Sequence, residues 1–131
     1  DKYKIKTKLK EFPNFAIQGE IYGPGIQKNP LNVKDKMFVV FNIYDMKSKR
    51  SLDYYEMEEV CKKMDLPVCI AIDKGDCFKY TLEDLFELVK GNYEGTENAR
   101  EGLVFRLAKN WYLPNFRCSF KIISSDFLLK K

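Results

Sequence analysis

Hydrophobic residues gather in several short runs between turn-forming residues, a pattern that predicts β-strands. Residues 15–22 form one such run, and a Gly-Pro-Gly turn follows directly, so we predict that a strand ends there. Residues 37–44, MFVVFNIY, are continuously β-branched or aromatic, which is typical of a strand buried on both faces. Similar runs predict further strands over 67–72, 102–108 and 117–124.

Two segments instead show the hydrophobic spacing of an amphipathic helix. Residues 54–64 have this spacing, and Asp53 stands where an N-cap residue is expected. A second helix is predicted to begin after Thr81, because Asp84 follows three residues later as in a capping box, and Gly91 is a suitable stop. The hydrophobic stripe of this helix comprises Leu82, Leu85, Phe86 and Val89.

The connections and the two ends of the chain are less regular. Residues 2–10 alternate lysine with mostly hydrophobic residues as a half-exposed strand does, but a helical face fits them nearly as well, so both structures stay open. We predict a turn at 73–76, a polar loop at 92–102 and a short extension at 126–131.

The order of these elements indicates an α+β fold with mostly antiparallel sheets and two or three interspersed helices. The chain has 131 residues, of which 45% are hydrophobic, and this suits one domain with a real core. No repeat or linker divides the chain, so we predict a single domain over 1–131. No hydrophobic stretch reaches the roughly 18 residues of a membrane span, so we expect no membrane partner.

Charge and composition narrow the chemistry that the chain can carry. The net charge of +4 is a mild bias, which permits an anionic partner without demanding one. The four cysteines lack the spacing of zinc ligands, so we expect free thiols and an intracellular location, cytoplasmic or nuclear. The chain contains no histidine, so acid-base or metal chemistry must come from carboxylates, lysines and the backbone.

Three charged residues stand on or beside predicted strands where a hydrophobic core would not place them: Glu20, Glu101 and Lys121. Each one alone is typical of a solvated strand face. Together, two carboxylates suit a hard divalent cation that also binds phosphate oxygens, and a lysine suits a phosphate. The aromatic residues Phe38 and Phe41 offer a stacking surface for a base. The set therefore indicates a nucleotide site that needs no histidine.

Four segments in this order, IQGEIYGPGIQKN, MFVVFNIYD, EGLVFR and SFKIIS, resemble the motifs of the covalent nucleotidyltransferases. These are the polynucleotide ligases and the mRNA capping guanylyltransferases. The long GEIYGPGIQKN run is similar to ATP-dependent RNA ligases of the type-2 branch, and the resemblance extends from about residue 15 to the end. It implies the ATP-grasp-like nucleotidyltransferase domain of polynucleotide ligases, represented by motifs III, IIIa, IV and V, with the N-terminal part missing.

The resemblance implies a role for each residue of the set. Glu20 matches the motif III glutamate, expected near the ribose and the metal, and Glu101 matches the motif IV glutamate, expected to hold the metal. Phe38 matches the aromatic residue that stacks on adenine, with Phe41 as the alternative if the register differs. Lys121 matches the motif V lysine, expected at the α-phosphate. The glycines after Glu20 would let the backbone pass close by.

The chain departs from the family pattern at three places. Ile123 stands where many relatives have a second motif V lysine, so phosphate neutralisation would rely on Lys121 and Lys130. Asn42 stands where motif IIIa often has an aspartate. No K-x-D/N-G motif, which carries the family's nucleophilic lysine, is present in the 131 residues. We therefore expect this stretch alone to be inactive.

The implied reaction uses ATP and Mg²⁺ or Mn²⁺ to seal RNA. A lysine attacks the α-phosphate of ATP, AMP passes to an RNA 5′-phosphate, and a 3′-hydroxyl then displaces AMP. The expected partners are RNA ends, nicked or single-stranded, together with ATP and AMP and the missing N-terminal part of the domain. Two alternatives stay open: a DNA ligase or capping guanylyltransferase relative, against which GPGIQKN argues, and a non-catalytic nucleic-acid-binding module.

Overall fold

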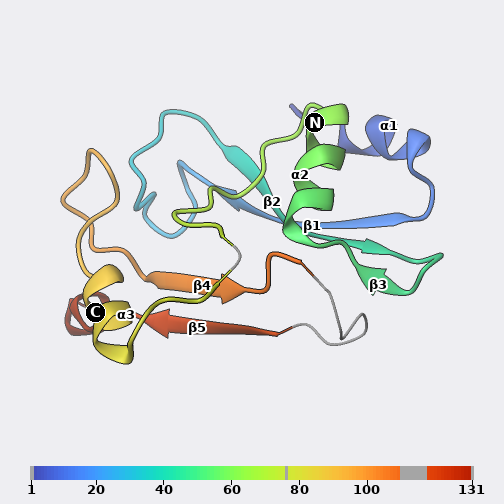
Figure 1. The fold of residues 1–131 in the computed structure, drawn as a ribbon. Coiled ribbons are helices and arrows are strands. Elements are labelled where there is room, and N and C mark those ends of the chain that lie inside the picture. The colour runs from blue at the N-terminus through green and yellow to red at the C-terminus, as the bar shows by residue number, and fades with distance from the viewer. Residues whose placement is uncertain (1, 76, 110–117, 131) are drawn as a thin grey trace. The chain divides into compact units, whose positions relative to one another are not determined.

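The computed structural model describes residues 2–75, 77–109 and 118–130. The chain divides into two compact units, and Figure 1 labels its helices and strands. The first unit comprises Asp1–Ile21, Phe38–Lys74 and Leu107–Arg117. The second unit comprises Tyr22–Met37, Gly75–Arg106 and Cys118–Lys131.

The first unit is built around a three-stranded sheet with the order β1-β2-β3. Strand β1, Phe15–Tyr22, has the bounds that the sequence predicts, and β2, Met37–Asp45, exceeds its prediction by one residue. The short β3, Arg50–Ser51, pairs antiparallel with the end of β2, so that Tyr44 faces Ser51. Strands β1 and β2 thus follow the hydrophobic runs of the sequence, whereas β3 is polar and was not predicted.

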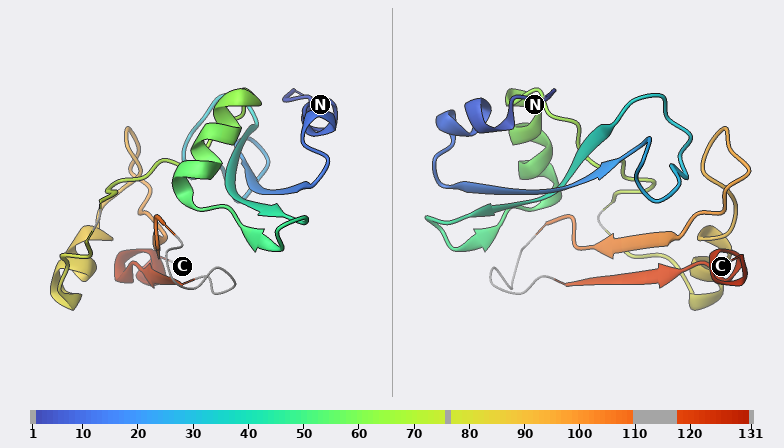
Figure 2. Two further views of the ribbon diagram at one scale, coloured as in Figure 1. Left: turned by 45° about the vertical axis from the view of Figure 1, so that its right-hand side comes forward. Right: turned by 180° about the vertical axis from the view of Figure 1, so that it is seen from behind.

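Helix α2, Tyr54–Lys63, lies along the sheet of the first unit and closes its core (Figure 2). The predicted N-cap is confirmed. The Asp53 carboxylate accepts a hydrogen bond from the Glu56 backbone N–H at 2.9 Å, and the Glu56 carboxylate accepts one from the Asp53 backbone N–H. The buried core residues come from β2, α2 and the segment after the helix: Val40, Ile43, Met57, Cys61, Met64 and Leu66.

The N-terminal segment adopts the helical one of its two predicted structures. It forms α1, Ile5–Lys8, and the 3₁₀ helix η1, Leu9–Glu11. Ile5 and Leu9 pack against the core of the first unit, so tertiary packing selects the helix over the alternating pattern.

Two strand predictions in the first unit need correction. The predicted strand at 67–72 is wrong: only Val68 forms a bridge, parallel to Val40, and Ile70 is 92% exposed. Only one bridge forms because the segment turns away from β2 directly after Cys69, whose backbone N–H donates to the Val40 carbonyl oxygen. Strand β2 is buried at three positions, whereas Tyr44 is exposed, so burial on both faces holds only for its middle.

The second unit contains the antiparallel hairpin of β4, Gly102–Arg106, and β5, Ser119–Ile123. Residue 117 of the predicted strand lies outside the described residues. Helix α3, Leu82–Leu88, has the predicted capping box of Thr81 and Asp84. Helix α4, Ser125–Leu129, forms most of the predicted terminal extension. Of the predicted α3 stripe, Leu85 and Val89 are buried, but Leu82 and Phe86 are about half exposed.

The predicted α+β class with antiparallel sheets is confirmed, although the described residues form four α-helices rather than two or three. The four cysteines are free thiols, as predicted, and burial raises the pKa of Cys61 to about 11. No helix among the described residues is long and hydrophobic enough to cross a membrane. The single domain over 1–131 stays a prediction.

Candidate functional site

Glu101 and Lys121 come together in the second unit. Glu101 directly precedes β4, and Lys121 lies in the middle of β5, opposite Val104 in the antiparallel register. The Lys121 ammonium donates to Glu101 Oε1 in an ion pair whose side chains are 43% and 44% exposed. The hairpin thus places a carboxylate and an ammonium side by side at the surface, although they are far apart in the sequence.

The main chain of Glu101 has hydrogen-bond partners of its own. Its carbonyl oxygen accepts from the Ser124 backbone N–H at 2.8 Å, at the end of β5. Its own N–H points to the Tyr93 hydroxyl oxygen at 3.5 Å. Neither contact was predicted: Tyr93 lies outside the four motif segments, and Ser124, although it ends the SFKIIS segment, reaches Glu101 only because β4 pairs with β5.

Glu20 lies exposed near the end of β1 in the first unit. Gly23 explains part of the turn behind it, since this glycine has φ 126° and an added Cβ would lie 2.6 Å from the Asp35 carbonyl oxygen. The expected close backbone passage is therefore present at Gly23. It is not present at Gly25, where a Cβ would meet nothing within 4 Å.

Phe38 is half-buried in β2 and already packs within the first unit. Its ring centroid lies 5.9 Å from that of Tyr3, and its edge occupies the space where a side chain at Gly19 would stand. Phe41, the alternative stacking residue, is also half-buried. The structure therefore assigns Phe38 a packing role, and its stacking on a nucleotide stays a prediction.

The four predicted site residues thus form two pairs. Glu20 and Phe38 lie in the first unit, whereas Glu101 and Lys121 lie in the second. The residues of the second pair are in direct contact as an ion pair. The convergence of all four residues on one site stays a prediction.

The three positions that depart from the family pattern have ordinary structural surroundings. Ile123, in place of a second lysine, ends β5 and is 46% exposed. The buried Asn42 donates to Gln18 Oε1 at 2.7 Å, a bond that links β2 to β1. Lys130 follows α4 as its C-cap residue.

The loop after Glu20 has an ordered local structure that the sequence did not predict. Gln27, Lys28 and Asn29 all have positive φ, a conformation that costs non-glycine residues energy. Asn29 offsets this cost with side-chain bonds to the N–H and carbonyl of Val33, at 3.2 and 2.8 Å. The Asn98 amide also donates to the Pro30 carbonyl at 2.8 Å.

The donor set of the described residues suits a hard divalent cation only in part. No group of three or more histidine, cysteine, aspartate or glutamate residues gathers in a metal-binding arrangement within the described part of the chain. Glu101 supplies a single exposed carboxylate, and Mg²⁺-type ions are often held by one or two carboxylates plus phosphate oxygens and water. Glu101 is therefore a fitting ligand for a cation that a nucleotide also holds.

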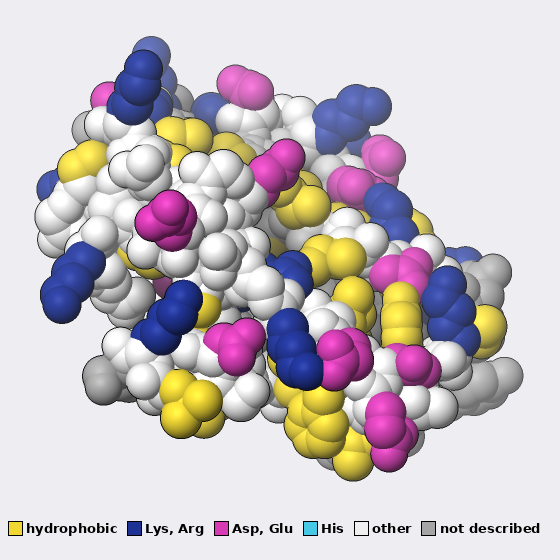
Figure 3. Space-filling model, turned by 90° about the vertical axis from the view of Figure 1, so that its left-hand side faces the viewer, with side chains coloured by type: hydrophobic (Ala, Val, Ile, Leu, Met, Phe, Trp, Pro, Cys, Tyr) yellow, Lys and Arg dark blue, Asp and Glu magenta, His cyan; other side chains and the backbone are white. Residues whose placement is uncertain are grey.

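The face of the molecule drawn in Figure 3 carries charges of both signs. Figure 3 shows lysine and arginine side chains interspersed with aspartate and glutamate on the face that it draws. Binding of a phosphate on this face would therefore depend on individual lysines rather than on a broad basic patch.

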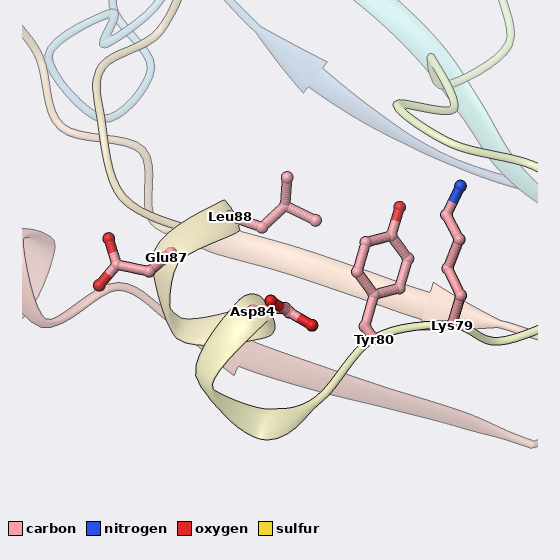
Figure 4. A pocket seen from close by; sticks show the side chains of 5 residues that line it. All are labelled: Lys79, Tyr80, Asp84, Glu87 and Leu88. Carbon is pink, nitrogen blue, oxygen red and sulfur yellow. The ribbon is translucent and has the colours of Figure 1, made fainter.

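An open pocket beside α3 contains none of the predicted site residues (Figure 4). Figure 4 shows the Lys79 and Tyr80 side chains side by side and extended in the same direction, next to the helix that carries the other lining residues. The acidic residues of this pocket already have partners: Asp84 closes the capping box, and Glu87 pairs with Lys90. We assign no chemical role to this pocket.

Comparison with known proteins connects these features to one family. A family model described as RNA ligase matches residues 1–123. Among solved structures, a mutant of Naegleria gruberi RNA ligase with AMP and Mn is 27% identical, with a TM-score of 0.80 over 99% of this chain and 38% of that chain. Another mutant of that ligase, with ATP and Mn, gives a TM-score of 0.82 at 27% identity, over 98% and 38% of the two chains.

The same Naegleria gruberi ligase with PPi is similar too, with a TM-score of 0.81 and 27% identity over 98% of this chain and 38% of that chain. The present chain therefore spans well under half the length of these solved structures. A comparison with curated proteins found no match.

Proposed function

The chain belongs to the RNA ligase family, and from this premise we propose that it is part of an ATP-dependent enzyme that seals RNA ends. It would form part of the adenylyltransferase domain of a type-2 branch ligase. The observation that carries the proposal is the ion pair of Glu101 and Lys121, which are the residues that resemble the metal-binding and phosphate-binding positions of the family.

The ion pair suits a site that receives a metal nucleotide. On binding, the Lys121 ammonium would pair with the α-phosphate instead of with Glu101. The Glu101 carboxylate would bind the divalent cation instead of Lys121. Each side chain would thus keep a partner of opposite charge. Because each side chain is more than 40% exposed, breaking the pair costs little. The main-chain bond from Ser124 would meanwhile keep Glu101 in place.

Glu20 and Phe38 would complete the nucleotide site from the first unit. Glu20 is exposed, as a ribose or metal contact requires, and the Gly23 turn holds the chain directly behind it. The Phe38 ring would present a face to adenine, and stacking of this kind is worth about 1–3 kcal/mol per base. Phe41 stays the alternative for this role.

The solved relatives with AMP, ATP, PPi and Mn support ATP and a divalent metal as the ligands, and Mg²⁺ belongs to the proposal on chemical grounds. The metal would supply charge stabilisation at the α-phosphate. Lys121 would add a positive charge beside the same phosphate, and it must stay protonated to do so. The nucleophile would then be a different lysine, in a K-x-D/N-G motif outside these 131 residues.

The test is RNA sealing by the full-length protein with single substitutions. Glu101→Ala and Lys121→Ala are each expected to lower the sealing rate by about 100-fold or more, because each removes a charge that acts on the transferred phosphate. The melting temperature should barely change, since substitutions of exposed residues usually alter stability by at most about 0.5 kcal/mol.

Glu87→Ala and Lys90→Ala provide matched controls. They break a comparable exposed ion pair in the same unit, and both should seal RNA at the wild-type rate. Wild-type sealing by Glu101→Ala would rule out the proposed role. Sealing of DNA nicks in preference to RNA, or transfer of GMP, would favour the ligase or capping relatives instead.

A second experiment concerns the 131-residue chain alone. Incubated with α-labelled ATP and Mn²⁺, it should form no labelled band on denaturing electrophoresis, because the nucleophile must stand about 3–3.5 Å from the phosphorus. The full-length protein should form the band. A band on the short chain that disappears when one of its lysines is replaced would place the nucleophile within these residues.

A further inference from the structure

Arg100 directly precedes Glu101, and its side chain turns back to the end of α3. Its Nη2 donates to the Leu88 carbonyl oxygen at 2.8 Å and also to the carbonyl oxygen of Lys90. Its backbone N–H donates to the Gly91 carbonyl oxygen at 3.0 Å. One residue therefore binds three carbonyl oxygens around the end of a helix, those of residues 88, 90 and 91, and the first two of these bonds are charge-assisted.

These bonds hold together the two ends of the loop that lies between α3 and β4. Within the loop, Asn92 and Ala99 form an antiparallel bridge, and the Tyr93 N–H donates to the Asn98 carbonyl at 2.9 Å. The loop is therefore closed at its base, and the first residue to leave it is Glu101. Anything that loosens Arg100 releases the start of β4 from the end of α3.

The helix itself does not need an arginine to end. Gly91, with φ 100°, follows the C-cap residue Val89 by two positions and already lets the chain turn away from the helix. Arg100 also comes at a cost, since its Nε is buried without a hydrogen-bond partner among the described residues. The arrangement is better explained by what it does for the next residue.

We propose that Arg100 is a positioning residue for Glu101. It anchors the main chain on one side of Glu101, while the Ser124 N–H bond from β5 anchors the carbonyl on the other side. The main chain of Glu101 is thereby held between α3 and β5, and the carboxylate stays in register with Lys121. This inference rests on the proposed function, in which Glu101 binds the divalent cation.

The test is direct Mn²⁺ binding to the full-length protein in the presence of a non-hydrolysable ATP analogue. Electron paramagnetic resonance of free Mn²⁺ provides the binding curve without any turnover. Arg100→Ala is expected to weaken Mn²⁺ binding about tenfold, because residues that orient a metal ligand typically contribute 10- to 100-fold to metal affinity. Arg100→Lys keeps the positive charge but loses some of the hydrogen-bond donors of the guanidinium. Its Mn²⁺ affinity should lie between those of the wild type and Arg100→Ala.

A double-mutant cycle separates positioning from general damage. In a Glu101→Gln background, Arg100→Ala should weaken Mn²⁺ binding no further, since Arg100 acts only through the carboxylate. Lys90→Ala is the matched control, because it removes a cation at the same helix end and keeps the carbonyl that Arg100 binds. It should bind Mn²⁺ as the wild type does.

Three results would overturn the inference. The first is a folded Arg100→Ala protein with wild-type Mn²⁺ affinity, and the second is the same loss of affinity in both backgrounds. The third applies if Arg100→Ala fails to fold: it is a folded Arg100→Lys protein that binds Mn²⁺ with wild-type affinity. Glu101→Gln keeps the tests distinct: a normal affinity in that variant contradicts the proposed function itself, whereas a weakened one with unaffected Arg100→Ala contradicts the positioning role alone.

Discussion

The two units differ in what their side chains do. In the first unit, β2 contributes Val40 and Ile43, both 0% exposed, to a core that α2 closes. In the second unit, no residue of β4 or β5 is buried, and the hairpin carries an exposed ion pair instead. The strands of the first unit therefore contribute buried core residues that the β4–β5 hairpin does not, and the hairpin can change its exposed charged residues at little energetic cost.

The largest effect on stability should come from the core of the first unit. Ile43→Ala removes a fully buried side chain between β2 and α2, and it should lower the free energy of unfolding by about 2–5 kcal/mol. Val104→Ala on β4 is the matched change in the hairpin, where the side chain is 56% exposed. It should cost no more than about 0.5 kcal/mol. Urea unfolding measures the free energy of unfolding of both variants. Equal losses would contradict the difference between the core and the hairpin.

The N-cap of α2 should have the next largest effect. Asp53→Ala removes the acceptor of the Glu56 N–H and should cost about 1 kcal/mol. Asp53→Asn keeps an equivalent acceptor and should stay close to the wild type. Thermal melting compares the two, and an equal loss in both variants would show that charge rather than capping matters at this position.

A smaller effect should depend on pH. Hydrogen bonds from Arg50, at 2.7 Å to each carboxylate oxygen, hold the pKa of Glu56 below its usual range despite partial burial. A lowered folded-state pKa stabilises the protein above the unfolded value, about 4.3, and this stabilisation is lost as the pH falls through the folded pKa. The pair is partly exposed, so we expect less than about 1 kcal/mol.

Glu56→Gln isolates this charge, because glutamine preserves the capping box. The variant should be less stable than the wild type at neutral pH, and the difference should be smaller at about pH 2, because protonation of Glu56 removes the charge that Arg50 stabilises. Urea unfolding at the two pH values is the measurement. A difference of the same size at both would assign the effect to packing.

How much of this could be predicted depends on how local each feature is. The caps at Asp53 and Thr81 were predictable, because their partners lie three residues away. The absence of the predicted strand at 67–72 could not be foreseen. A strand forms only if a neighbouring strand pairs with it along its length, and here β2 pairs with this segment at Val68 alone. Glu101 and Lys121 were singled out as charged residues on or beside predicted strands, and the family resemblance then implied their roles. The contacts of Glu101 with Ser124 and Tyr93 were not predicted.

The smallest effect should occur at Ser124, which is the most buried polar residue of the second unit. Its backbone N–H holds Glu101, but its hydroxyl is buried without a hydrogen-bond partner among the described residues. Ser124→Ala keeps the N–H and removes an unsatisfied polar atom, so stability should change by less than about 0.5 kcal/mol. A loss above 2 kcal/mol in thermal or urea unfolding would reveal a partner for this hydroxyl.

The central claim is that the two regions supply one nucleotide site. The most direct test is a crystal structure of the full-length protein with ATP and Mn²⁺. We predict that Phe38 or Phe41 stacks on adenine, Glu101 contacts the Mn²⁺ shell, Lys121 contacts the α-phosphate, and Glu20 lies near the ribose and metal. Glu20 and Glu101 carboxylates more than about 15 Å apart would contradict the claim, because no single hydrated cation could then serve both.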